Sequence, residues 1–335
     1  MATMKDVAIR ARVSTATVSR VLSRNGEKVS EDTLQRVAEA AKDLGYQPNH
    51  LPRNLRYSSS RTFALIISDI ANPFFPAVAR GCEDAAQESG YSVVLSNTDE
   101  NPERELSSLR VMAAERAAGV MVASTGKTHE GVRALLGMGI PVVALDRLIE
   151  DIEIDSVTVD NNDGAYQAVD HLVQEGHTRI AMISGPQWAS SIRDRQFGYE
   201  RALRAHGLEG RVSEGNLRPD GGYAATLEVL ASSPTPTAIF SVNNQTTVGV
   251  LRAIAERGVP IPEDISIIGF DDLPTGELLI PPLSVVSQPS YELGARAVEL
   301  LLRRIDDPTA PYEHVVLKPT LTLRASTSSP TGRVQ

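Results

Sequence analysis

Residues 4–22 read MKDVAIRARVSTATVSRVL and contain two short helical patterns with about three residues between them. Thr3 can cap the first pattern and Ser14 the second. The apolar residues of the first pattern recur at the spacing of a helix that buries one face: Met4, Val7, Ala8 and Ala11. Because so short a connection forces the two helices to cross sharply, the stretch predicts a helix-turn-helix.

A third helical pattern, EDTLQRVAEAAKDL at 31–44, follows Ser30 as an N-cap and ends at Gly45. Its apolar side chains are expected on one face: Leu34, Val37, Ala38, Ala41 and Leu44. We therefore predict an all-helical head over residues 1–46.

The composition and hydrophobic pattern of the chain change after the head. Residues 47–61 combine prolines, arginines and a run of serines, which is typical of a hinge or linker. From Thr62 onward apolar strands alternate with amphipathic helices: FALIIS, YSVVLSN, GVMVAS, PVVALD, RIAMIS, TAIFSV and DISIIGF. This alternation predicts an α/β fold with two doubly wound parallel-sheet lobes over 62–328, followed by a tail at 329–335.

Composition narrows the classes of protein. The chain has 335 residues and one cysteine, which excludes a disulfide framework and a cysteine-rich zinc site. No apolar run reaches the roughly 18–20 residues that span a bilayer, and no signal pattern opens the chain. These features predict a cytoplasmic protein.

Charge is divided unevenly along the chain. Residues 1–61 carry eleven Lys+Arg and six Asp+Glu, a net of +5, while the remainder carries 22 and 36, a net of −14. A basic head on an acidic body suggests that the head binds a polyanion. An ordinary solvated surface would have the same composition.

The second helical pattern has the composition of a base-reading helix. Small side chains allow close approach to a groove, and an arginine can contact guanine through two hydrogen bonds. The residues predicted to contact DNA from this region are Ser14, Thr15, Ala16, Thr17, Arg20 and Arg24. The alternative is a three-helix packing module that binds no nucleic acid.

Polar and aromatic residues lie at the predicted strand ends or at the starts of the helices that follow, where open α/β sheets bind ligands. They are Asn72, Phe74, Phe75, Asp146, Arg147, Arg195, Asn243, Asp271 and Gln288. Together they would suit a ligand rich in hydroxyl groups. Taken singly, each could instead be a helix cap or part of a surface ion pair.

Signals for catalysis are weak. STGKT at 124–128 lacks the first glycine of a phosphate-binding loop, because Met121 stands there. Asp271 and Asp272 have no histidine or further carboxylate at metal-binding spacing, and His171 and His177 are six residues apart. We predict no enzyme, no cofactor and no metal.

Motifs in the same order as in a known family extend through the chain. After the head come DIANPFFPAVARGCEDAAQESGY, GIPVVALDR, SVTVDNNDGAY, GHTRIAMISG, RDRQFGY, PEDISIIGFDD and PPLSVVSQPSYELG. From Met1 to about Arg324 the sequence resembles the LacI/GalR (lactose-repressor) family of transcription regulators. The resemblance implies lobes of the periplasmic-binding-protein type.

The resemblance also implies a hinge helix that folds on operator DNA. Leu55 would wedge into the minor groove, with Arg53 and Arg56 as phosphate or groove contacts. The sequence departs from the family at Pro52, where alanine is usual, and at Arg12, where glycine is common. Pro52 puts the start of the hinge helix in doubt, and Arg12 is expected to carry backbone strain.

For the cleft, the nine strand-end residues match the sugar contacts of ribose-type repressors and their ribose-binding-protein relatives. Leu217 and Ala123 depart from that pattern. The implied protein is a homodimeric repressor of a pseudo-palindromic operator, controlled allosterically by ribose or another pentose. No leucine-heptad tail follows Arg324, which favours a dimer over a tetramer.

Other interpretations stay open. Within the family, the signal could be another aldose, a sugar phosphate, a nucleobase or a phosphorylated carrier protein. More remote alternatives are a sugar-binding receptor and a sugar-modifying enzyme. The missing signal segment and the basic head argue against the receptor, and the missing phosphate loop and metal ligands argue against the enzyme.

Overall fold

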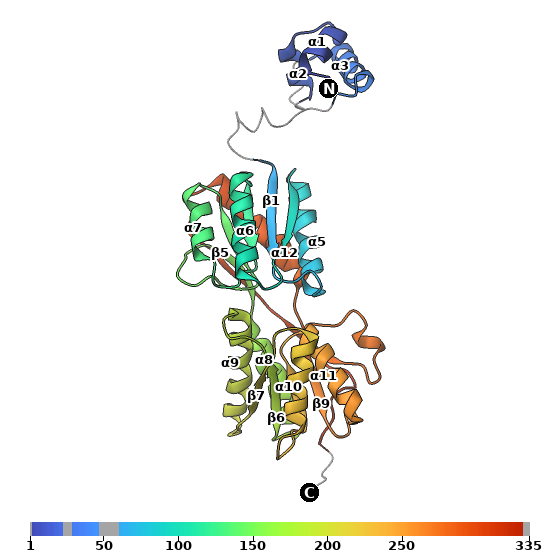
Figure 1. Ribbon diagram of the computed structural model, residues 1–335, viewed down its shortest axis with the longest axis vertical. Coiled ribbons are helices and arrows are strands. Elements are labelled where there is room, and N and C mark those ends of the chain that lie inside the picture. Colours follow the sequence, from blue (N-terminus) through green and yellow to red (C-terminus); the bar gives the residue numbers. More distant parts are fainter. Residues whose placement is uncertain (1, 23–28, 47–59, 331–335) are drawn as a thin grey trace. The chain divides into compact units, whose positions relative to one another are not determined.

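A computed structural model describes residues 2–22, 29–46 and 60–330 (Figure 1). These residues form two compact units, one within residues 1–60 and the other within 61–335. The proposed hinge, including Pro52, lies outside the described residues except for its last two positions.

The first unit is a three-helix head. It contains α1 (Met4–Ala11), α2 (Thr15–Leu22) and α3 (Glu31–Asp43). The Thr3 hydroxyl accepts from the Asp6 backbone N–H, and the Asp6 carboxylate accepts from the Thr3 N–H, so a capping box starts α1. The predicted helix-turn-helix is therefore present.

The core of the head is small and apolar. It consists of Val7, Ala8, Ala11, Val18, Val37 and Ala40, with Met4, Val21 and Leu22 packed against it. The predicted buried face of α3 was partly wrong, because Ala40 is buried while Ala38 is exposed. Successive helical residues are rotated by about 100°, so a face centred on Val37 and Ala40 turns Ala38 to solvent.

The second unit begins with a lobe built on a parallel sheet in the order β11-β5-β4-β3-β1-β2. Its strands are β1 (Thr62–Ile67), β2 (Ser92–Asn97), β3 (Gly119–Val122), β4 (Val142–Leu145), β5 (Asp155–Val159) and β11 (His314–Leu317). Its helices are α5 (Phe74–Glu88), α6 (Pro102–Ala114), α7 (His129–Gly137) and α12 (Ser290–Asp306). We call it the N-lobe.

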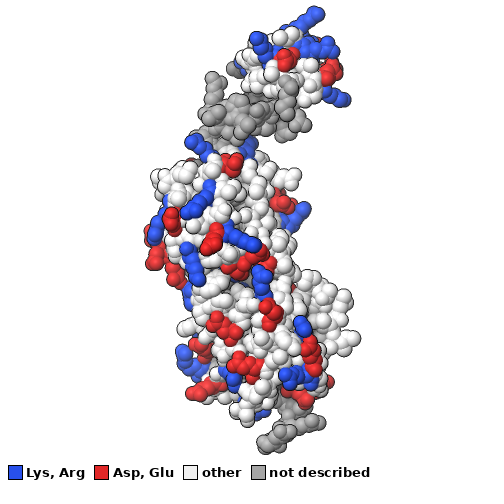
Figure 2. Space-filling model, viewed as in Figure 1, with Lys and Arg blue, Asp and Glu red and all other residues white. Residues whose placement is uncertain are grey.

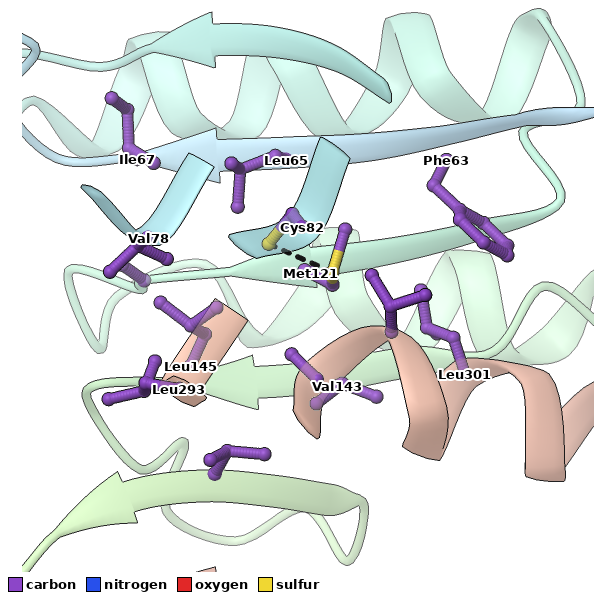
Figure 3. Close-up of a cluster of buried hydrophobic side chains, with 14 of the residues drawn as sticks. Phe63, Leu65, Ile67, Val78, Cys82, Met121, Val143, Leu145, Leu293 and Leu301 are labelled. Atoms are coloured by element: carbon purple, nitrogen blue, oxygen red, sulfur yellow. Dashed lines mark hydrogen bonds between the residues drawn. The ribbon is translucent and has the colours of Figure 1, made fainter. Parts of the chain in front are cut away.

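Alternating side chains of β1 divide the N-lobe core into two halves. Phe63, Leu65 and Ile67 face α5 and α12, whereas Ala64 and Ile66 face α6 and α7. Figure 3 shows the first half, in which the Cys82 thiol lies 3.7 Å from the Met121 sulfur. Helices therefore cover both faces of the sheet, as the alternating pattern predicted.

The second lobe, called the C-lobe, has the sheet order β12-β10-β9-β8-β6-β7, parallel except for β12. Its strands are β6 (Ile180–Ser184), β7 (Arg211–Glu214), β8 (Ala238–Ser241), β9 (Ser266–Phe270), β10 (Ser284–Ser287) and β12 (Thr320–Thr322). Its helices are α8 (Asn161–Gln174), α9 (Ser190–Ala205), α10 (Pro219–Leu230), α11 (Asn244–Arg257) and the 3-10 helix η1 (Gly276–Leu278). Core residues from α8 and α9 pack on one face of the sheet, and those from α10 and α11 pack on the other.

The chain passes between the lobes after β5, after β10 and after β11. Since β5 and β11 leave the N-lobe and β10 leaves the C-lobe at their carboxyl ends, the carboxyl edges of both sheets face the junction of the lobes. That is the edge at which sheets of this kind bind ligands. The fold therefore places the strand ends that precede the predicted residues at one junction between the lobes.

Candidate functional site

The exposed surface of α2 carries the side chains predicted to read bases. Thr15, Ala16 and Arg20 are exposed, while Val18 is buried in the head. On the face shown in Figure 2, Lys and Arg side chains project from the described part of the head among fewer acidic ones. Small side chains with one arginine suit close approach to a groove.

The start of α2 is fixed by a cap. The Ser14 hydroxyl accepts from the Thr17 backbone N–H at 3.0 Å, and the two hydroxyls lie 2.9 Å apart. Ser14 and Thr17 thus have a structural role in addition to their predicted contact with DNA. Arg12 adopts the left-handed conformation with φ of 55°, which agrees with the backbone strain expected at this position.

Arg24, Arg53, Leu55 and Arg56 lie outside the described residues. Their predicted contacts with DNA remain predictions.

The two lobes touch directly near the ends of the strands. The Asn244 amide donates to Asn72 Oδ1 at 3.0 Å, and the Gln245 amide donates to the Ala71 carbonyl at 2.8 Å. Elsewhere along the junction, the Leu148 N–H donates to Ser190 Oγ at 2.9 Å. The lobes are therefore closed on each other around the predicted cleft.

The N-lobe contributes a buried cluster of charged side chains to the site. Asp146 follows β4 with φ of 64°, and Arg147 comes next. The terminal nitrogens of Arg147 donate to the two carboxylate oxygens of Glu100, each at 2.8 Å. The Nε atom of Arg147 lies 3.4 Å from Asp146 Oδ2 but has no hydrogen-bond partner in the described part of the chain.

The C-lobe supplies a second buried guanidinium. Arg195 of α9 donates from Nε to Asn161 Oδ1 and from Nη1 to the Val242 carbonyl, both at 2.7 Å. Its guanidinium carbon lies 3.7 Å from the centre of the Phe270 ring, and Asp271 Oδ2 lies 3.9 Å from Nη1. These contacts fix the position of the Arg195 guanidinium near the carboxyl ends of the C-lobe strands.

Asp271 and Gln288 form the other side of the C-lobe site. Asp271 has φ of 66° and accepts from the Gln288 amide nitrogen at 2.6 Å. The Gln288 amide oxygen is buried without a hydrogen-bond partner among the described residues. A buried acceptor of this kind needs a donor, and the hydroxyl of a ligand would provide one.

Three further predicted residues have different surroundings: Asn243, Phe74 and Phe75. Asn243 caps α11 by accepting from the Thr246 N–H at 2.7 Å, which is one of the alternatives raised for such residues. The two phenylalanine rings meet edge to face at 5.0 Å. Phe75 is 2% exposed within the N-lobe core, whereas Phe74 also lines a cavity.

That cavity has a volume of about 640 Å³ and is lined from both lobes. Phe74 borders it on the N-lobe side, and Asn244, Asp271 and Gln288 border it on the C-lobe side together with the segment around η1. The buried groups Asp146, Arg147 and Arg195 do not line this cavity. Ligand pockets typically have volumes of about 300–1,000 Å³, so the size suits a small molecule.

The charged groups of the cleft affect one another. Burial raises the pKa of Asp146 and of Asp271, although Arg147 and Arg195 oppose this at Asp146, and Arg195 opposes it at Asp271. Burial lowers the pKa of Arg195, against the pull of Asp271 and Asp146. Burial also opposes ionisation of Glu100, but Arg147 outweighs it and holds the Glu100 pKa below its usual value. The structure thus brings Asp146, Arg147, Arg195 and Asp271 into one electrostatic unit.

Four residues of the site were missed by the sequence analysis: Glu100, Asn161, Trp188 and Asn244. Asn161 and Asn244 each begin a helix just after a strand, a signal that could have found them. Trp188 precedes α9, and its ring lies 5.4 Å from the Arg147 guanidinium. Glu100 lies three residues after β2 and Trp188 four residues after β6, closer than Asn72 lies to β1, so the signal of a strand end could have found them as well.

Other chemistries find little support in the described residues. Asp272 does not join Asp271 in a metal-like pair, because it binds Arg324 at 2.6 and 3.1 Å. No cluster of three metal-ligating side chains occurs in 2–22, 29–46 and 60–330. Over the same ranges, no helix has the length and apolar composition of a membrane span.

Two family models match the chain. Residues 3–49 match the bacterial regulatory proteins of the lacI family, and residues 169–327 match a periplasmic binding protein-like domain. The first match covers the described head, and the second covers most of the C-lobe.

Curated relatives match over nearly the full length. The ribose operon repressor of Halalkalibacterium halodurans is 37% identical, with 94% of each chain covered. Catabolite control protein A of Priestia megaterium is 36% identical, with 97% of this chain and 99% of the relative covered. Overall sequence identity therefore indicates the family, but it does not show which of these two relatives has the function of this chain.

Solved structures agree. A Lac repressor dimer bound to operator and an anti-inducer has a TM-score of 0.86 at 28% identity, covering 98% of this chain and 99% of that one. A LacI family regulator from Enterococcus faecium with bound ribose has a TM-score of 0.73 at 29% identity, covering 81% and 100%. With its helix-turn-helix head, its two α/β lobes and full-length relatives above 30% identity, the chain belongs to the LacI family of DNA-binding transcriptional regulators.

Proposed function

We propose that the protein is a repressor whose two-lobed unit senses a pentose, with ribose as the lead candidate. The observation that carries the proposal is the convergence of Asp146, Arg147, Arg195 and Asp271 on one buried site between the lobes. The ribose operon repressor among the relatives and the ribose-bound member among the structures support the choice of sugar.

The chemistry of the site suits vicinal hydroxyl groups. Carboxylates of Asp146 and Asp271 would accept from hydroxyls, and the Nε of Arg147 would donate to one. The unpartnered oxygen of Gln288 would accept another hydroxyl proton, and the Phe74 ring would lie against the C–H face of the sugar. Such charge-assisted hydrogen bonds give both affinity and orientation.

We further propose that two chains act together on DNA. The heads of a dimer would read a pseudo-palindromic operator through Thr15, Ala16 and Arg20, since the symmetry of the protein is mirrored in its site. The dimer and operator named in the Lac repressor structure support this arrangement. The protein would act in the cytoplasm, and since the family consists of regulators, we propose no enzymatic reaction.

Calorimetric titration with a panel of pentoses and hexoses tests the proposal. We expect ribose to bind the full-length protein, and Asp271→Asn to abolish detectable binding because a buried acceptor is lost. The matched control is Asp264→Asn, an exposed acid that precedes β9, whereas Asp271 follows it, and that does not line the cavity. Ribose binding that survives Asp271→Asn but not Asp264→Asn would contradict the assignment, as would a wild-type protein that binds no pentose.

A further inference from the structure

Arg147 is held by an acid from a distant loop. Arg147 follows β4, and its guanidinium binds Glu100 in the loop after β2, although β3 and β1 lie between β4 and β2 in the sheet. The loop brings Glu100 back to the end of β1, where its N–H binds the Ser68 carbonyl. Both side chains are largely buried, at 6% and 17% exposure. A two-pronged contact of this kind fixes the plane of the guanidinium.

The backbone conformation of the loop that carries Glu100 is fixed by hydrogen bonds. Asp99 and Glu100 both have positive φ, 53° and 59°, which ordinary side chains rarely adopt. The Glu100 N–H donates to the Ser68 carbonyl at 2.9 Å, and the Asn97 amide donates to Asp99 at 2.8 Å. A conformation that costs backbone energy persists only where surrounding contacts enforce it, so Glu100 is aimed at Arg147.

No guanidinium of the cleft is left without an acid or carbonyl partner. The terminal nitrogens of Arg147 face Glu100, and Arg195 is bound to Asn161 and to the Val242 carbonyl beside Asp271. A further acid, Glu105, is fully buried behind the site and accepts from Ser124 Oγ and the Thr125 N–H, each at 2.7 Å. Two buried guanidiniums are thus surrounded by four carboxylates, Glu100, Glu105, Asp146 and Asp271, and the exposed Arg218 also acts on Glu100.

We propose that Glu100 is a positioning residue that makes the cleft select uncharged sugars and reject their phosphates. By occupying the terminal nitrogens of Arg147, Glu100 leaves Nε, which lies beside Asp146, as the group available to a ligand. A neutral hydroxyl can bind there. A phosphate would find its best cation already occupied and would enter a site with excess negative charge. The inference rests on the proposed function in placing the effector in this cleft.

The test compares full-length wild type, Glu100→Gln, the double variant Glu100→Gln/Arg147→Gln and the control Glu103→Gln. Glu103 is an exposed acid in the first turn of the neighbouring helix α6, so the control loses the same charge nearby. Each protein is titrated with ribose, ribose 5-phosphate and inorganic phosphate. Binding is read by calorimetry and by the fluorescence of Trp188, the one tryptophan of the sequence, which lies beside Arg147.

We expect wild type and Glu103→Gln to bind ribose 5-phosphate at least about tenfold more weakly than ribose. Glu100→Gln should strengthen binding of ribose 5-phosphate and of inorganic phosphate by about tenfold, because Arg147 becomes free to bind an anion. The double variant should lose this gain. If Glu100→Gln does not fold, Glu100→Asp, which breaks the two-pronged contact but keeps the charge, should give a smaller gain of the same sign.

Equal phosphate affinity in wild type and Glu100→Gln would overturn the inference, and so would a gain that persists in the double variant. A wild type that prefers ribose 5-phosphate to ribose would also overturn it. If no variant binds ribose but Glu100→Gln alone gains phosphate binding, ribose is wrong as the effector and the role of Glu100 stands.

Discussion

At the residue scale, Arg20 is expected to read a base. Arg20→Ala should relax preference at one operator position by roughly 1–3 kcal/mol, because one arginine–guanine contact is lost. The measurement is operator binding across a set of single-base variants at fixed salt. An equal loss of affinity for every sequence would make Arg20 a phosphate contact instead.

The residues of the cleft were predictable to different degrees. Asp146 and Asp271 directly follow strands, so their position at the carboxyl edge of a sheet was predictable from the strand pattern. Glu100 also follows a strand, β2, but its contact with Arg147 depends on the positive φ of Asp99 and Glu100, which no sequence pattern reveals. Leu217, where the sequence departs from the family, is buried with φ of 63°, and its side chain fills the space beside Gly185.

Asp146 should make stability depend on pH. Burial raises its pKa, so the native state resists its ionisation, and the stability present at low pH is lost as pH rises through the native pKa. Asp146→Asn should therefore stabilise the unliganded protein at pH 8, where the ionised carboxylate is disfavoured by burial. The gain should shrink toward pH 4, and thermal unfolding at both values measures it. A gain that is the same at both pH values would exclude ionisation as its cause.

At the scale of elements, the seven apolar runs were predicted well, whereas the interior strands β5 and β10 and three of the four edge strands were not named. The seven apolar segments named from the sequence all contain strands. By contrast, β7, β11 and β12 have three or four residues each with exposed or half-buried positions, so they lack the signal of a buried strand. Edge strands are recognised mainly by what they pair with, and pairing is a tertiary property.

The caps of α2 and α3 give a matched test at this scale. Ser14 accepts from the Thr17 N–H. Ser30 stands at the N-cap of α3, where its hydroxyl lies 2.9 Å from the Thr33 hydroxyl but makes no capping hydrogen bond to the helix backbone. Ser14→Ala should destabilise the head by about 1 kcal/mol. Ser30→Ala should cost clearly less. Chemical denaturation monitored by far-ultraviolet circular dichroism of a head fragment or the intact chain compares them, and equal losses would contradict the assignment.

At the scale of the whole molecule, control of DNA binding is a coupling between two sites. If ribose changes operator affinity by some factor, operator must change ribose affinity by the same factor, typically worth about 1–3 kcal/mol. We expect this equality in paired titrations at one salt concentration, with Asp271→Asn showing no change of operator affinity on adding ribose. Two unequal factors would mean that ribose and operator do not share a single linked equilibrium.

The three passages of the chain between lobes have a consequence for the order of folding. The N-lobe sheet begins with β1 near the start of the second unit and is completed by β11, and α12 covers the Phe63 and Leu65 face only after β10 has been made. A nascent chain therefore holds an open N-lobe until translation is nearly finished, with apolar surface exposed for chaperones to bind. The head, whose own core lies within its three helices, is complete long before that. The head is therefore synthesised before the two-lobed sensor that controls it. If synthesis stopped early, the released fragments would contain a DNA-binding head that no sugar can control.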